Sequence, residues 1–571
     1  SILIVKIHMN MEKIRIFSVW MMALILTSCN NLDLNPLSES STGNFYSNQQ
    51  ELEMAINDLY RSPFYSVDDE LMTDNMTTRT ISNAVVTGTI NSDWTGSADL
   101  WTNSYKAIAR VNSFMLYKDQ AKDNTDPDVM TRLEAEARFI RAYQYSVLVN
   151  HFGDLPFLTN YISLEDSYKM GRTSKNKILD FVYDELGWAA NNLPETYATN
   201  QQQRFTKGAA LAVKARTALY AGEWEIAKTA ASAVMELEKK GIYQLHPDYR
   251  TLFLSEGQNN KEIIMSNPRS ETYGVVNAGA TVLGRYLTRT AGFTCSVMPT
   301  RELIDSYECT DGLPIDKSPL YNPQKPFDNR DPRLIETIVK HGSDWLQFRY
   351  QPHPDTLKVR SYKDNKLVDN KDSRGKDSYA SYTGFVWKKG YDQTMADRKV
   401  DDVDLIIIRY AEMLLTYAEA KIELGEVDSS VLEAINKVRA RAYKTTVEAT
   451  DYPKVVTTNV EQLRTIIKRE RRVEFVKEGL RYMDLIRWRI AEDALTKPVL
   501  GMPDAVNQDR KKWPFPGTPT IDENGIPDYT SMLNDCKILG ERSFNKERQY
   551  LWPIPSSELL VNSNLNQNPN Y

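Results

Sequence analysis

The chain has little of what metal centres and disulfide frameworks require. Its 571 residues include only four cysteines, and no two of them form a Cys-x-x-Cys pair, which argues against a structural zinc site. A disulfide between Cys295 and Cys309 is an open alternative outside the cytoplasm, because spacing alone does not establish a pairing. The histidines beyond residue 28 are scattered without metal-ligand spacing, so we expect no metal and no cofactor.

The chain also lacks a strong excess of one charge, a linker and a phosphate-binding loop. Its formal net charge is −6 with both signs interspersed, which argues against nucleic acid as a partner. No stretch rich in Pro, Gly or Ser divides the sequence, so we expect one large composite domain or two tightly apposed lobes. No glycine-rich loop follows a predicted strand at the spacing that cradles phosphates.

The first apolar segment has the layout of a bacterial lipoprotein signal. Lys13 and Arg15 precede an apolar stretch at 16–26, and the residues LTSC follow at 26–29. A run of eleven residues is too short to cross a hydrocarbon core, which needs about 20. We therefore favour an export signal over a transmembrane helix.

Cys29 is accordingly predicted to be the first mature residue and to carry acyl chains that tether the protein to a membrane. Residues 1–28 would be the signal peptide, of which 1–10 precede a plausible start at Met11 and are excluded from the fold. The alternative is an ordinary secretory peptide that happens to contain a cysteine.

Three segments place alanine and large apolar residues at helical spacing. They span 135–150, 208–221 and 405–424, and a glycine follows each of them. Ser430 with Glu433 resembles a capping box that opens a partner helix at 431–442. Paired helices with small residues facing large ones are typical of tetratricopeptide-like hairpins, although unrelated amphipathic helices remain the alternative.

The rest of the chain alternates between helical and irregular character. Helices are predicted near 49–60, at 101–117 and in a last block at 461–489, whereas 62–100 and 241–403 carry loop signals with a few short strand-like runs. The predicted fold is mainly α, with a tetratricopeptide-like helical scaffold and a loop-rich second lobe. Long loops on a rigid scaffold are where binding surfaces usually lie.

One acidic cluster invites a catalytic interpretation. Glu470, Glu474, Glu478 and Asp484 could supply a pair of glycosidase carboxylates. Five basic residues between 471 and 487 are interleaved with them and would keep these carboxylates ionised, which defeats a general acid. We favour a structural charge network, and we expect no enzymatic activity.

Aromatic residues in polar, nonperiodic stretches are the better candidates for ligand contacts, because aromatic residues on periodic helices belong to the core. Trp94 fits best, flanked by Asn91 and Asp93. Partial burial under a loop is the alternative for each candidate, and tryptophans inside helical or framework patterns are assigned to packing. The further candidates are Tyr273, Tyr286, Trp345 and Tyr350.

Seven stretches along the chain have the character of family motifs. The most distinctive are AEARFIRAYQYSVLVNHFGDLPFLT at 135–159, RRVEFVKEGLRYMDLIRW at 471–488 and YLWPIPSSELLVNSNLNQNPNY at 550–571. The other four are at 32–48, 204–227, 327–334 and 406–426. In chain order they resemble the SusD/RagB family, whose members are surface lipoproteins paired with TonB-dependent transporters. The last motif departs twice from the family pattern, with Ser563 in place of Pro and Asn570 in place of Gly. Asn is the commonest substitute for Gly at positive φ, so the second change is mild.

The resemblance implies a helical region at 29–240 and a loop-rich region at 241–571 that includes a helical hairpin near 405–442. It also implies a noncatalytic lipoprotein of the outer membrane, facing the exterior, that binds oligosaccharides or polysaccharides and delivers them to a SusC-like TonB-dependent transporter. Two alternatives remain: capture of peptides or another non-sugar nutrient by the same architecture, and a surface hydrolase.

Overall fold

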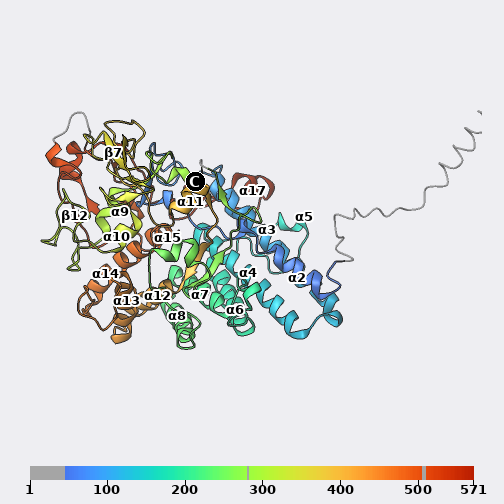
Figure 1. The fold of residues 1–571 in the computed structure, drawn as a ribbon. Helices are drawn as coiled ribbons and strands as arrows, with labels where there is room; N and C mark the ends of the chain where they lie inside the picture. The colour runs from blue at the N-terminus through green and yellow to red at the C-terminus, as the bar shows by residue number, and fades with distance from the viewer. Residues whose placement is uncertain (1–44, 280–281, 504–509) are drawn as a thin grey trace, which may run out of the picture.

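The computed structural model describes residues 45–279, 282–503 and 510–571, so the predicted signal peptide and Cys29 lie outside the described ranges. Long helices run along the lower side of Figure 1, and a lobe of loops and short strands lies above them. Within the described ranges, no helix combines the length and the apolar character that crossing a bilayer requires.

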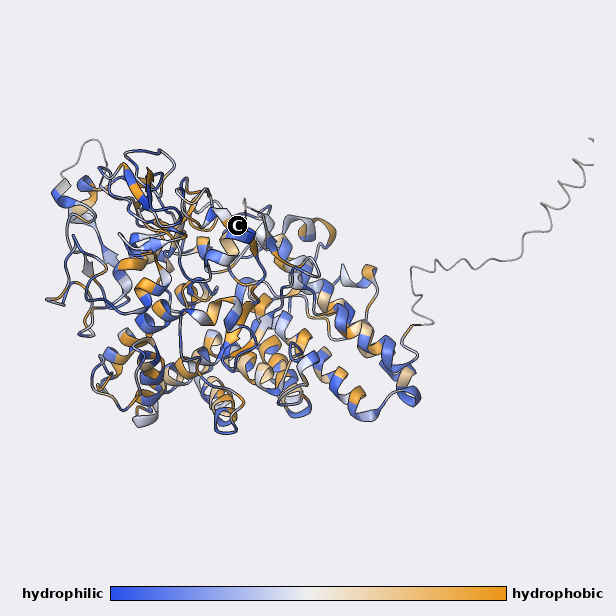
Figure 2. Ribbon diagram, in the orientation of Figure 1, coloured by the Kyte–Doolittle hydropathy of each residue, from blue (hydrophilic) through white to orange (hydrophobic). Residues whose placement is uncertain are grey.

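The long helices pack side by side in chain order, and a later hairpin extends the row. Each helix contacts the next, and α12 packs against α8 although the whole central excursion of the chain separates them. Hydrophobic and hydrophilic residues alternate along these helices in Figure 2, as amphipathic packing requires. The row consists of α3 (Thr95–Tyr117), α4 (Pro127–Phe152), α6 (Lys175–Asn192), α7 (Lys207–Ala221), α8 (Trp224–Lys239), α12 (Tyr410–Glu423) and α13 (Ser429–Ala442), and α2 (Gln49–Asp58) packs on α4.

Local sequence signals fix the ends of these helices. The Asp126 carboxylate caps α4, and Gly153 ends it with a φ of 75°. The Thr206 hydroxyl accepts a hydrogen bond from the Ala209 backbone at the start of α7, and Gly222 ends that helix at a φ of 77°. Positive φ costs other residues about 1–2 kcal/mol, which explains why glycine stands at both turns predicted from the sequence.

The predicted helix at 405–424 is wrong over its first five residues. Leu405–Arg409 forms strand β10, which pairs antiparallel with β2 (Ile263–Asn267), and α12 begins only at Tyr410. The run Leu-Ile-Ile-Ile is rich in β-branched residues, and pairing with a distant strand satisfies its backbone. A helical pattern that continued upstream by chance concealed this boundary.

The predicted capping box of α13 is also wrong by two residues. The Asp428 carboxylate accepts from the Ser430 backbone N–H, so Asp428 is the cap and α13 starts at Ser429. The Ser430 hydroxyl donates to the same carboxylate at 2.5 Å. A carboxylate beside two serines outcompetes them because it also meets the positive end of the helix dipole.

The last helical block is interrupted rather than continuous. Helix α14 (Val460–Glu474) ends before Lys477 and Gly479, which adopt φ values of 63° and 74°, and α15 (Arg481–Arg487) follows. At the end of the chain Asn570 has a φ of 64°, which confirms that asparagine replaces glycine there at positive φ.

The two largest hydrophobic clusters of the described residues organise the structure. The larger one joins α2, α3, α4, α6, α7 and α8 to α12, α13 and α14. It therefore crosses residue 240, where the domain division was predicted; that division stays a prediction. The second cluster lies in the loop-rich lobe, around residues of the excursion between α8 and β10. The strands of the lobe are short. One four-stranded sheet consists of β5 (Asp344–Trp345), β6 (Phe348–Arg349), β7 (Lys358–Ser361) and β8 (Lys366–Asp369). Two of the separate strand pairs are β1 (Met76–Thr78) with β4 (Val297–Pro299), and β11 (Val499–Leu500) with β14 (Ile538–Gly540).

Buried ion pairs join the scaffold to the lobe. Glu474, at the end of α14, accepts hydrogen bonds from Arg333 at 2.8 Å, from Arg409 at 2.7 Å and from Arg441. The three arginines hold the pKa of Glu474 well below its usual range despite its burial. Glu478 accepts from Arg409 and from Lys389, each at 2.6 Å, and its pKa is lowered as well.

The remaining carboxylates of the acidic cluster are paired in the same way. Asp484 accepts from Arg471 at 2.9 Å and from Arg487 at 2.8 Å, and Glu470 binds Arg333 at 2.7 Å. The predicted structural charge network is therefore confirmed. The pKa values of Glu474, Glu478 and Asp484 are lowered by these partners, so these three carboxylates are not available as general acids.

Candidate functional site

Two hollows in the described part of the chain combine accessible aromatic side chains with polar groups. The first, which we call the lobe pocket, encloses about 440 Å³ of space, open solvent included. The second, which we call the scaffold groove, is larger at about 1270 Å³ and lies between α3, the loop after α4, and α17 (Ser556–Val561). The lobe pocket is lined by Pro352, Pro354, Arg374, Ser381, Tyr382, Gly384, Met502, Pro503, Trp513 and Lys537.

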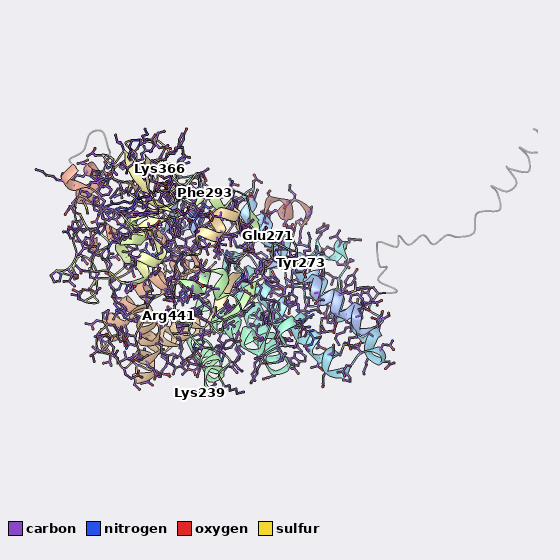
Figure 3. The ribbon with its side chains drawn as sticks, viewed as in Figure 1. Lys239, Glu271, Tyr273, Phe293, Lys366 and Arg441 are labelled. Carbon is purple, nitrogen blue, oxygen red and sulfur yellow. The ribbon has the colours of Figure 1, made fainter. Side chains whose placement is uncertain are left out.

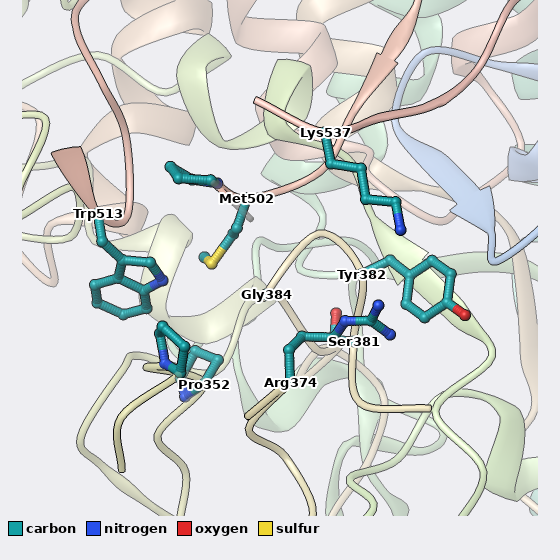
Figure 4. A pocket seen from close by; sticks show the side chains of 10 residues that line it. Pro352, Arg374, Ser381, Tyr382, Gly384, Met502, Trp513 and Lys537 are labelled. Atoms are coloured by element: carbon teal, nitrogen blue, oxygen red, sulfur yellow. The ribbon is translucent and has the colours of Figure 1, made fainter. Parts of the chain in front are cut away.

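Strand pairing brings the two ends of the lobe pocket together. Strands β11 and β14 pair antiparallel, and the Gly501 backbone donates to the Lys537 carbonyl at 2.7 Å. Met502 lies two residues after β11 and Lys537 directly precedes β14, so this short pair sets both side chains at the hollow. In Figure 4 Met502 lies between Trp513 on one side and Arg374 with Tyr382 on the other.

The floor of the lobe pocket requires a glycine. Gly384 has a φ of 74°, and a Cβ atom there would lie 2.1 Å from the Met502 Cε atom. Its carbonyl oxygen accepts hydrogen bonds from the Tyr350 hydroxyl at 2.8 Å and from the His341 Nε2 atom at 2.9 Å. Two buried groups thus fix the backbone on which a ligand would rest.

Trp513 is held between two imidazole rings. His341 stacks on it at a centroid distance of 5.5 Å, and His353 meets its ring edge-on at 4.6 Å. Burial lowers the pKa of His341 to about 4, so this ring is neutral at physiological pH. The Trp513 side chain is half-buried, which leaves part of the indole to the pocket.

The opposite wall combines an aromatic ring with two cations. The Arg374 guanidinium carbon lies 4.2 Å from the centroid of the Tyr382 ring, and the Lys537 ammonium lies 5.8 Å from the same centroid. Both distances are within the range of cation–π attraction. Figure 4 shows the two cationic groups converging beside Tyr382.

A second aromatic–cation contact lies next to this wall. Arg79 donates to the Tyr379 carbonyl at 2.7 Å and to the Cys295 carbonyl at 3.1 Å, and its guanidinium carbon lies 5.3 Å from the centroid of the Tyr379 ring. The Tyr379 side chain is 57% exposed. Arg79 therefore ties the loop that carries Tyr379 and Tyr382 to the loop at 294–295.

This geometry suits recognition of a ring-shaped polar ligand. The half-buried indole of Trp513 can cover an apolar C–H face, while the Arg374 and Lys537 cations lie on the same hollow to meet polar substituents. Among the described residues, no group of three or more His, Cys, Asp or Glu side chains is placed to hold a metal ion. The three described cysteines, Cys295, Cys309 and Cys536, are buried free thiols, so the open disulfide between the first two is not formed.

The scaffold groove has a different character. Its lining is mostly apolar, with Trp101, Tyr105, Tyr161, Leu164 and Tyr168 among its members. Tyr161 is 54% exposed and Leu164 is 69% exposed. The groove offers apolar contact area and carries few charged groups.

The structure places Trp94, the best candidate from the sequence, in a packing position at the start of α3. Its ring meets Trp552 edge-on at a centroid distance of 4.7 Å and covers Gly96, where an added Cβ atom would lie 2.3 Å from the indole. Asp93 accepts from the Ser556 hydroxyl at 2.5 Å, and Asn91 accepts from the Asp93 backbone at 2.9 Å. These three residues line neither the lobe pocket nor the scaffold groove, and their binding role stays a prediction.

Two further candidates are accessible but lie apart from both hollows. Tyr273, labelled in Figure 3, is 83% exposed in a turn that ends at Gly274. Tyr286 is half-buried, stacks on Tyr391 at 5.5 Å and lies 4.9 Å from the Lys477 ammonium. Nothing in their surroundings joins them to the lobe pocket, and their role as ligand contacts also stays a prediction.

Trp345 and Tyr350, the last two candidates, are buried, and their role as ligand contacts stays a prediction. Trp345 lies in strand β5 and is 8% exposed, and Tyr350 is 1% exposed. Both belong to the hydrophobic cluster of the lobe, because the surrounding loops fold over them. Tyr350 nevertheless supports the site indirectly through its hydrogen bond to the Gly384 carbonyl.

The aromatic residues that do line the lobe pocket were missed in the sequence. Tyr382 stands in SYASYTG at 378–384, and Trp513 stands in KKWPFPG at 511–517. Both stretches are polar or Pro-rich and nonperiodic, so the rule that selected Trp94 also applies to them. The sequence carried the signal but gave no reason to prefer one such stretch to another.

Comparison with known proteins agrees with the resemblance found in the sequence. Residues 256–571 match the family model described as "SusD family", and residues 31–219 match one described as "Starch-binding associating with outer membrane". SusD-like protein P38 of Formosa agariphila is 26% identical over 88% of this chain and 97% of its own length.

Solved structures give the same picture. A SusD-like carbohydrate binding protein from Bacteroides fragilis superposes with a TM-score of 0.75 at 29% identity, covering 91% of this chain and 100% of that one. A second SusD-like protein from the same organism reaches a TM-score of 0.71 at 25% identity, over 94% and 99% of the two chains. Since the first family model alone spans more than half of the sequence, the chain belongs to the SusD family.

Proposed function

We propose that this protein is a noncatalytic lipoprotein of the outer membrane that binds oligosaccharides or polysaccharides at the lobe pocket and delivers them to a SusC-like TonB-dependent transporter. Cys29 would carry the lipid anchor, and the pocket would face the cell exterior. The observation that carries the proposal is the lobe pocket itself, where the half-buried ring of Trp513 faces Tyr382 across a hollow edged by hydrogen-bond donors.

The comparisons support the carbohydrate class and the location. The Bacteroides fragilis relative is described as carbohydrate binding, and the model matching residues 31–219 is described as starch-binding and associated with the outer membrane. Starch-binding protein SusD of Bacteroides thetaiotaomicron is 23% identical to this chain over 98% of both sequences. The transporter partner and the exterior orientation follow from the family resemblance.

The absence of catalysis in this proposal rests on how the acidic cluster is used. Glu474, Glu478 and Asp484 are buried in ion pairs that lower their pKa values, so none of them can serve as a proton donor near neutral pH. The proposal predicts that the purified protein leaves every bound polymer intact.

The test is affinity electrophoresis of the purified protein through gels that contain single polysaccharides. We expect at least one polysaccharide to retard the protein, and we expect Trp513→Ala to abolish this retardation. The variant should lose no more unfolding free energy than the removal of a half-buried aromatic ring explains. Tyr161→Ala, in the scaffold groove, is the matched control for removing an accessible aromatic ring elsewhere. Trp94→Ala and Tyr273→Ala, run in the same gels, test whether these two candidates from the sequence contact the polysaccharide.

The outcomes separate the hypotheses. Loss of retardation only in Trp94→Ala or Tyr273→Ala would move the site away from the lobe pocket. Shortening of a bound polymer during incubation would replace the binding function by a hydrolase. Incorporation of labelled palmitate that disappears in Cys29→Ala, and copurification of a barrel transporter from solubilised membranes, would test the anchor and the partner.

Capture of peptides or another non-sugar nutrient is the second candidate, and the scaffold groove favours it. Its apolar lining and its volume of about 1270 Å³ suit an extended, partly apolar ligand better than a hydroxylated one. Affinity for a peptide library combined with loss of that affinity in Tyr161→Ala would support this function in place of the first.

A further inference from the structure

Two cations of the lobe pocket have no carboxylate partner in the described part of the chain. Arg374 donates one hydrogen bond, to the Ser378 carbonyl, and lies over the Tyr382 ring. Lys537 is exposed, and its ammonium approaches the same ring. Neither side chain is within ion-pair distance of an Asp or Glu among the residues that the structure describes.

The carboxylates nearest to these two cations in the chain are already committed elsewhere. Asp372 accepts hydrogen bonds from the backbone N–H groups of Arg289 at 2.7 Å and of Thr290 at 3.3 Å. Asp377 pairs with Arg289 at 2.8 Å, and Asp535 pairs with Lys512 at 2.6 Å. The ten residues that line the hollow include Arg374 and Lys537 but no acidic side chain. The described lining therefore carries two positive charges that it does not itself neutralise.

The surroundings of these charges strengthen their effect on a ligand. Pro352, Pro354 and the Trp513 indole form apolar walls, which lower the local dielectric and reduce screening by water. The stacking of Arg374 on Tyr382 also restricts the guanidinium before any ligand arrives, so less conformational entropy is lost on binding.

We propose that the lobe pocket selects acidic sugars, with the sugar ring against Trp513 and its anionic substituent between Arg374 and Lys537. The substituent would be the carboxylate of a uronic acid or a sulfate ester, since the planar fork of a guanidinium matches either group. This inference rests on the proposed function, because it names the class of glycan that the same pocket takes.

The test compares polysaccharides that differ only in their charged group. The full-length protein is run against dextran and dextran sulfate, and against polygalacturonate and its carboxyl-reduced counterpart. We expect binding to at least one charged probe to exceed binding to its neutral counterpart about tenfold or more, the factor that a charge-assisted hydrogen bond provides. Raising the salt concentration from about 0.05 M to about 0.5 M should weaken only this charged component.

Three variants locate the effect. Arg374→Met and Lys537→Met should each lower affinity for the charged probe about tenfold while leaving affinity for the neutral one unchanged. Lys537→Arg should retain most of the binding, because it keeps the charge. Lys366→Met is the matched control, since Lys366 is an exposed lysine on β8 of the same lobe, labelled in Figure 3, and lies outside the pocket.

Preference for dextran sulfate would identify a sulfate ester and preference for polygalacturonate a uronate, and either result supports the inference. Equal affinity for charged and neutral probes, or an equal loss in Lys366→Met, would overturn it while leaving glycan binding intact. Binding to none of the four probes would also overturn the inference. If the protein also bound none of a full panel of neutral polysaccharides, the proposed function itself would be refuted.

Discussion

Replacing Glu474 with glutamine should destabilise the protein strongly, because this carboxylate is the shared acceptor of three buried arginines. It binds Arg333 and Arg409 at 2.8 and 2.7 Å and also accepts from Arg441, and its side chain is 0% exposed. The amide removes one negative charge and turns an N–H₂ group toward a guanidinium. The substitution changes neither the size nor the shape of the side chain.

The magnitude follows from what remains around each arginine. Breaking a buried ion pair by removing one partner costs about 3–5 kcal/mol. Arg409 keeps Glu262 and Glu478, Arg333 keeps Asp331 and Arg441 keeps Glu262. None of the three arginines is therefore left without a carboxylate. We therefore expect the lower end of the range, a loss of about 3 kcal/mol in the free energy of unfolding at pH 7.

Urea denaturation followed by tryptophan fluorescence measures this loss. Glu433→Gln is the matched control, because Glu433 is 61% exposed and lies 3.6 Å from Lys437, so its removal should change stability by no more than about 0.5 kcal/mol. A loss below about 1 kcal/mol in Glu474→Gln would show that the network does not hold scaffold and lobe together as described.

The same variant carries a pH signature. The pKa of Glu474 is lowered in the folded protein, so its stabilising contribution is complete above the unfolded value near 4.5 and is lost as the pH falls below it. The gap between the wild type and Glu474→Gln should therefore be constant from pH 7 to pH 5 and should narrow below about pH 4.5. A gap that widened on acidification would contradict the assigned direction.

Two further predictions concern the floor and the wall of the lobe pocket. Gly384→Ala should lower the free energy of unfolding by more than the roughly 1–2 kcal/mol of left-handed backbone strain, because the new methyl group displaces Met502. The same displacement should weaken polysaccharide retention. Gly425→Ala, at a φ of 72° with open space around it, is the control that measures the backbone strain alone in urea denaturation. The pKa of His341 is lowered from 6.5 to about 4, so the stability of the wild type should decline as the pH falls from 6.5 toward 4. His341→Phe should remove this pH dependence in denaturation curves measured across the same range. An unchanged pH dependence would show that His341 is not buried as described.

Where the sequence failed, long-range contacts decided the outcome. Residues 405–409 follow a helical pattern, yet they pair with β2, which lies far upstream in the chain. Trp345 and Tyr350 stand in polar stretches like those of the exposed tyrosines, yet neighbouring loops bury them. Periodicity and polarity describe only the immediate surroundings of a residue and do not report which distant segment will cover it.

The sequence by itself determined the features that depend on neighbouring residues: the amphipathic helices, the glycine turns at Gly153, Gly222 and Gly425, and the interleaving of Glu and Arg that makes a charge network. Only the tertiary structure decided the site. The lobe pocket joins residues 352–384, 502–503, 513 and 537, and the pairing of β11 with β14 and the hydrogen bonds to the Gly384 carbonyl bring them together. Such contacts depend on how loops separated by more than a hundred residues pack against one core, and this packing leaves no periodic trace in the sequence.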